Sequence, residues 1–484
     1  MSVAESPSSE KTAGVAKPKP RRFHPVLPAE PAIALAPPPL SLHQPTLGEL
    51  VPTEVLRQLA RPCQADDARR RKLPCEVFFW LAVLAFGPGG WVKLKTICTY
   101  LTAARSVSGH SGAACQVSKE AVSENFRERP WSFFAAVLHY LLSAYDPLWQ
   151  QLAGRPNAQM LEELQVVLVD ATSLRVALKL VDVFPARPNG KLARWAGVKL
   201  HVALNLFSRV PVVVRLSPET QNELKYLSFL RPAGEAVLYI FDLGFWSFGL
   251  FDQIVTRGQQ FLSRVRRDCA ATILAVHQGE PGWVGQRVSA IQLRGTQVDL
   301  VVQLGGGHHP RLHPPLRLVG CWLETEQVWH LYVTSLMDRA AYPVALLADL
   351  YRLRWQIEIF FRNLKCVLRM ANFVSQTENG IRIQIYAALI HYVLTHLVIL
   401  QAMRVTGRPF EDFSLPYCLD AVQHVLKQTG ELVRRGPAPN WTQLEDRLVQ
   451  AVLANGLRPN RHRLALITSV KARWPTARLP AQPS

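Results

Sequence analysis

The sequence predicts a mixed α/β fold in which helical segments flank a strand-rich centre. Three observations support this fold class. Apolar residues recur at helical spacing before about residue 160 and again after about residue 380. Between these regions, short apolar runs and period-two alternation indicate β-strands. Two of the most apolar runs end in an aspartate, and the carboxyl ends of strands are where open sheets carry functional side chains.

The chain begins with a low-complexity arm followed by a helical region. Residues 1–44 are rich in Pro, Ser, Lys and Ala without a period, which predicts a disordered basic arm. Residues 45–160 follow a helical pattern, and we expect a DNA-binding region there. Within it, a helix at about 117–129 carries a polar face, whose residues are Lys119, Ser123 and Arg127. A DNA-reading helix and an ordinary amphipathic helix explain this face equally well.

From residue 161 the pattern changes to strands. The predicted elements are, in order, strands at 164–170, 198–207 and 210–216, a helix at 219–230, a strand at 236–242, a helix at 248–255 and a strand at 260–266. Three strands followed by helix, strand, helix and strand is the ribonuclease H-like arrangement. The first and fourth strands end at Asp170 and Asp242.

A β-rich insertion follows, at about 268–336, because this segment alternates with period two and contains many turns. Its predicted strands are 271–276, 288–293, 297–304, 316–323 and 328–335. Pro343 then opens a long helix, which completes a catalytic domain spanning 161–380. Residues 381–484 are predicted to form a helical C-terminal region with a basic tail, and the helices are 382–403, 415–435 and 442–455.

The most informative segment is 351–365 within the long helix. At about 100° per residue, its polar side chains form one narrow stripe beside a separate apolar face. The stripe contains Tyr351, Arg354, Glu358 and Lys365. A carboxylate flanked by cations at the edge of a core is well suited to binding a metal ion and a phosphate beside it.

Three carboxylates complete the predicted site. Asp170 and Asp242 at neighbouring strand ends, with Glu358 on a helix crossing the sheet, supply the oxygen ligands of a two-metal phosphodiester site. Either aspartate alone is also explained as a helix cap or a turn residue. The three acids together with the polar stripe favour catalysis.

Composition agrees with a polyanionic partner. The net charge is +19 in 484 residues, which makes nucleic acid the first candidate, although a basic protein from a GC-rich genome would look similar. The basic charge is not gathered on one amphipathic helix, and we expect no membrane partner. The eight cysteines are scattered and indicate reduced thiols. We see no signal peptide or transmembrane span, and we expect a cytoplasmic protein.

The four stripe residues also carry a resemblance. Their spacing, Tyr-x2-Arg-x3-Glu-x6-Lys, resembles the signature of DDE transposases of the insertion-sequence-four type. Asp170-Ala-Thr resembles the first aspartate block of that family. Asp242-Leu-Gly-Phe-Trp, followed by Phe-Leu-Ser-Arg264, resembles the second block, with Phe245 where Tyr is more usual.

This resemblance implies a DNA transposase with Asp170, Asp242 and Glu358 as catalytic and metal-binding acids. It implies two Mg²⁺ ions, which Mn²⁺ may replace, and phosphate contacts at Tyr351, Arg354, Lys365 and Arg264. The expected partners are double-stranded DNA, as terminal inverted repeats and target, and a second copy of the chain in a synaptic homodimer. The expected location is the prokaryotic cytoplasm, on the nucleoid.

Two other functions remain open from the sequence. One is a catalytically silent DNA-binding protein descended from a transposase, although none of the three acids is missing. The other is a ribonuclease H-like nuclease that cleaves without strand transfer. A strand-transfer assay would separate these functions from cut-and-paste transposition.

Overall fold

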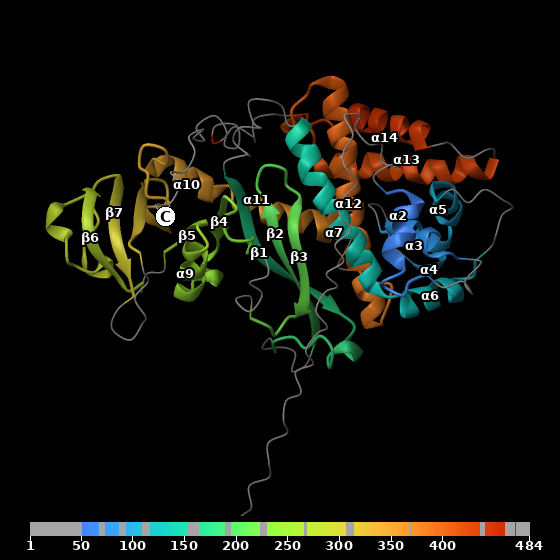
Figure 1. Cartoon of the computed structure of the whole chain (residues 1–484), viewed down its shortest axis with the longest axis horizontal. Coiled ribbons are helices and arrows are strands. Elements are labelled where there is room, and N and C mark those ends of the chain that lie inside the picture. The colour runs from blue at the N-terminus through green and yellow to red at the C-terminus, as the bar shows by residue number, and fades with distance from the viewer. Residues whose placement is uncertain are drawn as a thin grey trace, which may run out of the picture.

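A computed structural model gives the structure of the chain. It describes residues 51–66, 73–86, 93–108, 117–152, 164–188, 195–222, 230–265, 269–305, 314–367, 370, 372–435, 441–459 and 470. The predicted N-terminal arm and most of the helix predicted at 219–230 lie outside these residues. The molecule is elongated, with the helices of both terminal regions at one end and the strands β6 and β7 at the other (Figure 1).

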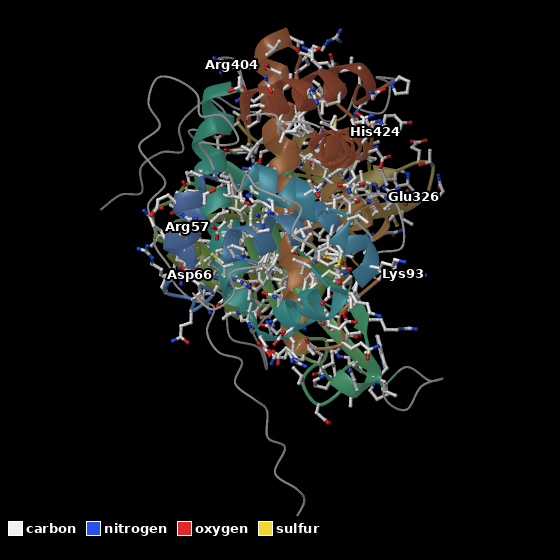
Figure 2. The ribbon with its side chains drawn as sticks, turned by 90° about the vertical axis from the view of Figure 1, so that its right-hand side faces the viewer. Arg57, Asp66, Lys93, Glu326, Arg404 and His424 are labelled. Atoms are coloured by element: carbon white, nitrogen blue, oxygen red, sulfur yellow. The ribbon has the colours of Figure 1, made fainter. Side chains whose placement is uncertain are left out.

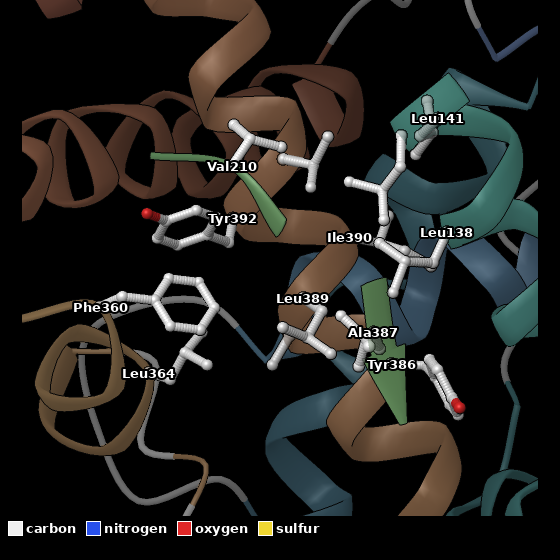
Figure 3. Packing of buried hydrophobic residues seen from close by; sticks show 14 of the residues in the cluster. Leu138, Leu141, Val210, Phe360, Leu364, Tyr386, Ala387, Leu389, Ile390 and Tyr392 are labelled. Carbon is white, nitrogen blue, oxygen red and sulfur yellow. The ribbon is translucent and has the colours of Figure 1, made fainter. Parts of the chain in front are cut away.

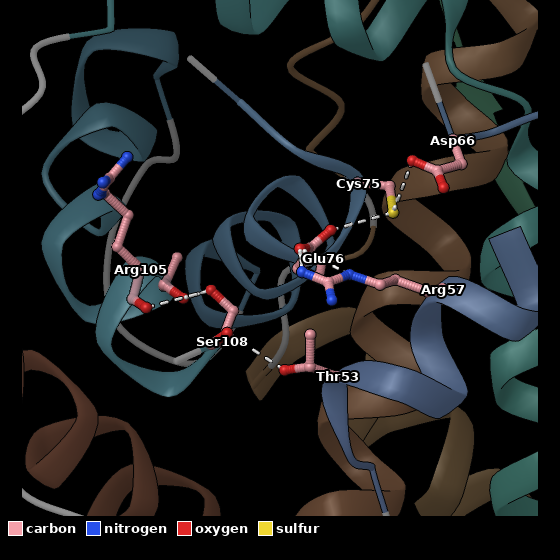
Figure 4. A network of polar contacts seen from close by, with 8 residues as sticks. Thr53, Arg57, Asp66, Cys75, Glu76, Arg105 and Ser108 are labelled. Atoms are coloured by element: carbon pink, nitrogen blue, oxygen red, sulfur yellow. Dashed lines mark hydrogen bonds and ion pairs between the residues drawn. The ribbon is translucent and has the colours of Figure 1, made fainter. Parts of the chain in front are cut away.

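The first helices form a compact group. They are α2 (Thr53–Ala60), α3 (Cys75–Ala85), α4 (Leu94–Cys98), α5 (Leu101–Val107), α6 (Lys119–Glu128) and α7 (Trp131–Leu152). Every residue of α3 is buried, because its sequence is apolar on all sides. The one acid of α3, Glu76, forms an ion pair with Arg57, with 2.8 Å between Glu76 Oε1 and Arg57 Nη2 (Figure 4). This ion pair connects α2 to α3.

A nine-stranded sheet crosses the molecule in the order β3-β2-β1-β4-β5-β9-β8-β7-β6. Its first five strands are β1 (Gln165–Val176), β2 (Ala196–Asn205), β3 (Pro211–Pro218), β4 (Val237–Phe241) and β5 (Gln260–Arg264). β2 is antiparallel to β1 and β3, whereas β4 is parallel to both β1 and β5. The mixed α/β class is therefore confirmed, with strand directions that match the ribonuclease H-like arrangement.

The insertion extends this sheet. Its strands are β6 (Ala271–Gln278), β7 (Gln297–Leu304), β8 (Leu316–Leu323) and β9 (Val328–Thr334), and β9 pairs with β5. The strand predicted at 288–293 is wrong, because the structure has only a 3-10 turn there, Val288–Ala290. β6 pairs with β7. Among the described residues, the segment before Val288 pairs with β6 only through an isolated bridge between Thr272 and Arg287.

Different helices cover the two faces of β1, β4 and β5. Leu168, Ile240 and Leu262 belong to the large core cluster shared with the later helices α10 (Val344–Arg352) and α11 (Trp355–Arg362). Residues of the opposite parity on these strands pack with α9 (Phe248–Thr256) in a second cluster. The period-two pattern of each strand thus assigns its side chains to one face or the other.

α12 (Glu378–Thr406) is the central helix of the larger core. Its most apolar window, which is long enough to cross a membrane, is 94% buried inside the protein. Helices α3, α6, α7, α13 (Leu415–Arg435) and α14 (Trp441–Asn455) all contact it. Figure 3 shows Phe360 and Leu364 against Leu389 and Tyr392, with a 5.1 Å edge contact between the rings of Phe360 and Tyr392. This packing fixes α11 to α12.

Buried histidines of α12 predict an acid-sensitive fold. Burial lowers the pKa of His391 to about 4, although its contact with the Val83 carbonyl opposes the shift. The unfolded chain therefore binds more protons below about pH 6.5, and the free energy of unfolding should fall as the pH drops from about 6.5 towards 4. We expect His391→Gln to reduce this pH dependence in urea titrations at several pH values.

The control is His424→Gln, since His424 is exposed on α13 (Figure 2) and should leave the pH dependence unchanged. An identical pH dependence in wild type and His391→Gln would contradict the assignment.

Candidate active site

Asp170 and Asp242 lie next to each other on neighbouring parallel strands. Val169 and Phe241 are the last residues paired between β1 and β4, and each aspartate follows directly. Asp170 has the parity of Leu168, and Asp242 has the parity of Ile240, so both should face the helices α10 to α12. β1 is longer than predicted and continues to Val176, so Asp170 lies within the strand and not at its end.

Glu358 reaches this face from α11. The prediction of one continuous helix through 351–365 is wrong, because α10 ends at Arg352, α11 begins at Trp355, and a π-turn follows at Asn363–Val367. Hydrogen bonds of the i→i+3 kind tighten the chain between the helices, such as Arg354 N–H to the Tyr351 carbonyl. A single 3.6-residue period therefore does not run through the polar stripe.

Arg354 joins two of the three acids. Its Nη2 donates to Glu358 Oε1 at 2.7 Å, and its Nη1 lies 3.7 Å from Asp170 Oδ2. Only 18% of the Arg354 side chain is exposed, which limits solvent screening of these pairs. Burial lowers the pKa of Arg354, but Tyr351, Asp242 and Glu358 outweigh it and raise the pKa above its ordinary value.

Tyr351 and Asp242 belong to the same site. The pKa of Tyr351 is raised to about 12, chiefly by burial; Asp242 also raises it, whereas Arg354 and Arg264 lower it. The Tyr351 ring packs on Tyr332 of β9, with ring centroids 4.7 Å apart. The phenol thus stays protonated at neutral pH and is held between the sheet and α10.

Lys365 and Arg264 lie at the margins of this group. Lys365 is half-buried in the π-turn, where burial lowers its pKa, and it forms no ion pair with a carboxylate of the described residues. Arg264 is exposed at the end of β5. It lines a groove of about 830 Å³ together with Leu243, Trp329 and His330. One of its lining residues, Leu243, directly follows Asp242 in the sequence.

The acids suit a divalent cation in chemistry, because hard cations prefer carboxylate oxygens. Among the residues that the structure describes, no three His, Cys, Asp or Glu side chains are gathered closely enough to hold a metal ion. Instead, the Arg354 guanidinium supplies the positive charge between Asp170 and Glu358. Arg354 is therefore paired with two of the three predicted metal ligands.

Sequence reasoning missed a buried charge cluster that supports the site. Arg317 of β8 makes a bidentate pair with Asp299 of β7, at 3.0 and 2.7 Å, and is fully buried. Its Nη1 also donates to the Tyr342 carbonyl at 2.7 Å, just before α10 begins. The signal was present, because both charged residues interrupt runs that otherwise read as buried strands.

The chain is similar in sequence to known transposases. Residues 162–394 match the family model described as "Transposase DDE domain". The chain is 28% identical over 232 residues to a putative transposase, y4zB, of Sinorhizobium fredii, which covers 46% of this chain and 61% of that protein. It is 23% identical over 355 residues to the transposase for insertion sequence element IS231C of Bacillus thuringiensis subsp. berliner, covering 62% of this chain and 70% of the relative.

A probable transposase for insertion sequence element IS5377 of Geobacillus stearothermophilus is 27% identical over 278 residues, covering 56% of this chain and 65% of the relative. The chain thus spans less than two thirds of the length of this relative and of y4zB. Among solved structures, a piggyBac transposase synaptic complex with hairpin DNA aligns with a TM-score of 0.38 and 11% identity, over 84% of this chain and 78% of that one.

Proposed function

We propose that the chain is a DNA transposase, because residues 162–394 match the model of the transposase DDE domain. The proposed reaction is metal-dependent cleavage at terminal inverted repeats followed by strand transfer, in a cut-and-paste reaction. The observation that supports this function best is the link from Asp170 through Arg354 to Glu358, with Asp242 beside it. These residues come from β1, α11 and the end of β4, which are distant in sequence.

The proposed roles follow from charge and position. Asp170, Asp242 and Glu358 would hold two Mg²⁺ ions, for which Mn²⁺ can substitute, and bound metal activates water and stabilises developing charge on phosphate. Arg354 would exchange its carboxylates for a DNA phosphate, which a guanidinium binds through two parallel hydrogen bonds. Lys365 and Arg264 would add phosphate contacts on either side, and Tyr351 would donate from its protonated hydroxyl.

The proposed partners are the inverted repeats at the two transposon ends, target DNA and a second copy of the chain. Two ends have to be cut together, which a homodimer achieves by holding one end in each site. We place the reaction on the nucleoid of a prokaryotic cell. The strong positive charge of the chain favours association with DNA at low salt.

End recognition is proposed for the region 45–160, with α6 as a candidate reader. Removing this region would not test the idea, because α3, α6 and α7 pack directly on α12 and share its core. Such a truncation would expose a large apolar surface and compromise folding. Surface substitutions on α6 are therefore the appropriate test.

The phosphate roles of Arg354 and Lys365 predict a change in salt dependence. For Arg354→Ala and Lys365→Ala, we expect the slope of log affinity against log salt to fall by about one unit each, because each lost phosphate contact releases about one counterion fewer. The measurement is a salt titration of binding to an end-containing duplex. Strand transfer should fall in both variants.

Arg352→Ala is the matched control, since Arg352 is 65% exposed and pairs with Asp349. It should leave the salt slope unchanged. If Arg354→Ala lowered the melting temperature but kept the wild-type salt slope, Arg354 would serve only to neutralise Glu358 and Asp170. Cleavage without strand transfer would instead identify a nuclease, and binding without cleavage a catalytically silent protein.

A further inference from the structure

A second polar cavity lies between the N-terminal helices and the catalytic domain. It has a volume of about 320 Å³. Ser123 and Arg127 of α6 form one wall, and Lys179, from the turn that follows β1, contributes to another. Ser375 and Thr377, just before α12, complete the polar lining. Three regions that are distant in sequence therefore meet around it.

The walls of this cavity are held firmly. The Asn379 side chain donates to the carbonyls of Phe126 and Arg129 at 2.9 and 2.6 Å, and accepts from the Trp131 N–H at 3.0 Å. This fixes the end of α6 to the first turn of α12. Gln384 in turn bonds the backbone of Asn372 and Val374, which holds the segment before α12. A site built on such contacts is preorganised for a ligand.

The chemistry of the lining suits a phosphate. Arg127 and Lys179 are exposed cations, and Lys179 has no ion pair with any described residue. Among the residues that the structure describes, Arg127 pairs only with the neighbouring Glu128, at 3.2 Å, and such an exposed pair is weak and easily exchanged. The Ser123 hydroxyl adds a hydrogen-bond donor. The Ser375 and Thr377 hydroxyls lie 3.0 Å apart and one donates to the other, so this pair leaves one more hydrogen to donate. Thr377 also caps α12, whose dipole adds positive potential to that of the two cations.

The polar face of α6 is thereby divided. Ser123 and Arg127 line the cavity, whereas Lys119, one turn earlier, does not line it and pairs with Glu120 at 3.6 Å. Lys119 is thus a cation of the same helix that lies outside the cavity.

We propose that this cavity binds a backbone phosphate of duplex DNA, with Arg127 and Lys179 as its cationic ligands. The inference rests on the proposed function and deepens it. One phosphate would be held jointly by α6 and by the turn after β1, the strand that carries Asp170. A duplex bound there would be placed at a fixed position relative to the catalytic sheet, independently of its base sequence.

The test compares Arg127→Ala and Lys179→Ala with Arg404→Ala in the full chain, because Arg404 is an exposed cation of α12 that does not line the cavity. We expect each of the first two to lower the slope of log affinity against log salt by about one unit on duplex DNA, at equal cost on end-containing and unrelated duplexes. Arg404→Ala should keep the wild-type slope. Circular dichroism and melting temperature verify the fold of each variant.

A wild-type salt slope in Lys179→Ala and Arg127→Ala, with wild-type folding, would overturn the proposal. Calorimetry with inorganic phosphate tests whether the cavity binds a free phosphate ion and not a phosphate of the DNA backbone. If phosphate binding were lost in Lys179→Ala while the DNA slope stayed unchanged, the cavity would be a free-anion site and the proposal would fail. Metal-dependent cleavage by the wild type, measured in parallel, tests the transposase function separately, so the two ideas can fail independently.

Discussion

Replacing Asp170, Asp242 or Glu358 with the corresponding amide is expected to abolish DNA cleavage while preserving DNA binding. Each amide keeps the size of the side chain but removes the negative charge that a divalent cation needs. We expect the cleavage rate to fall by at least about 10²–10³-fold, the scale seen when a group that stabilises the transition state is removed. The measurements are cleavage of an end-containing fragment in Mg²⁺ and in Mn²⁺, and duplex affinity.

Binding should survive in these variants, because removing negative charge next to Arg354 does not weaken its attraction to phosphate. The matched control is Asp252→Asn, since Asp252 is exposed on α9, which covers the opposite face of the sheet. It should cleave like the wild type. Wild-type cleavage by Asp242→Asn would remove Asp242 from the site and contradict the shared role of the three acids.

The second large effect is expected at the buried pair of Asp299 and Arg317. Arg317→Ala should lower the free energy of unfolding by about 3–5 kcal/mol, because it leaves a buried carboxylate without its main partner. The side chains of Arg317 and Asp299 are 1% and 6% exposed, so solvent cannot compensate. Arg339, whose Nε lies 3.5 Å from Asp299 Oδ2, offers only a partial substitute. Urea unfolding measures the change.

A double variant, Asp299→Leu with Arg317→Met, should be more stable than Arg317→Ala, because no buried charge is left alone. We expect this variant to cleave DNA more slowly than the wild type. Without Arg317, the Tyr342 carbonyl that precedes α10 loses its hydrogen bond, so the position of Glu358 is fixed less precisely. A loss of less than about 1 kcal/mol in Arg317→Ala would show that the pair is not a buried structural element.

Asp170 and Asp242 could be singled out from the sequence, because apolar runs that end in Asp are easy to recognise. Their side-by-side placement depends on the parallel register of β1 and β4, and pairing between distant segments leaves no local pattern. The end of β1 was misplaced for a related reason. The strand continues beyond Asp170 as a partner of β2, in a stretch whose side chains are only partly buried.

The structure brings Tyr351, Arg354 and Glu358 together, but not through the continuous helix that their spacing predicts. A prediction from the ideal helical period does not include the i→i+3 hydrogen bonds around Arg354 or the π-turn that contains Lys365. Both depend on how the apolar residues of α10 and α11 fit the sheet and α12. Breaks of this kind in helices often accompany functional sites, and here they occur on both sides of Glu358.

The most direct test of the account is cleavage by the purified wild-type protein of a fragment that contains the DNA flanking its coding sequence. That DNA should contain short inverted repeats, which serve as the substrate. With Mg²⁺ or Mn²⁺, we expect breaks at the outer edges of the repeats, free 3′-hydroxyl ends, and joining of those ends to a target plasmid. Binding to the repeats without any metal-dependent break would contradict it.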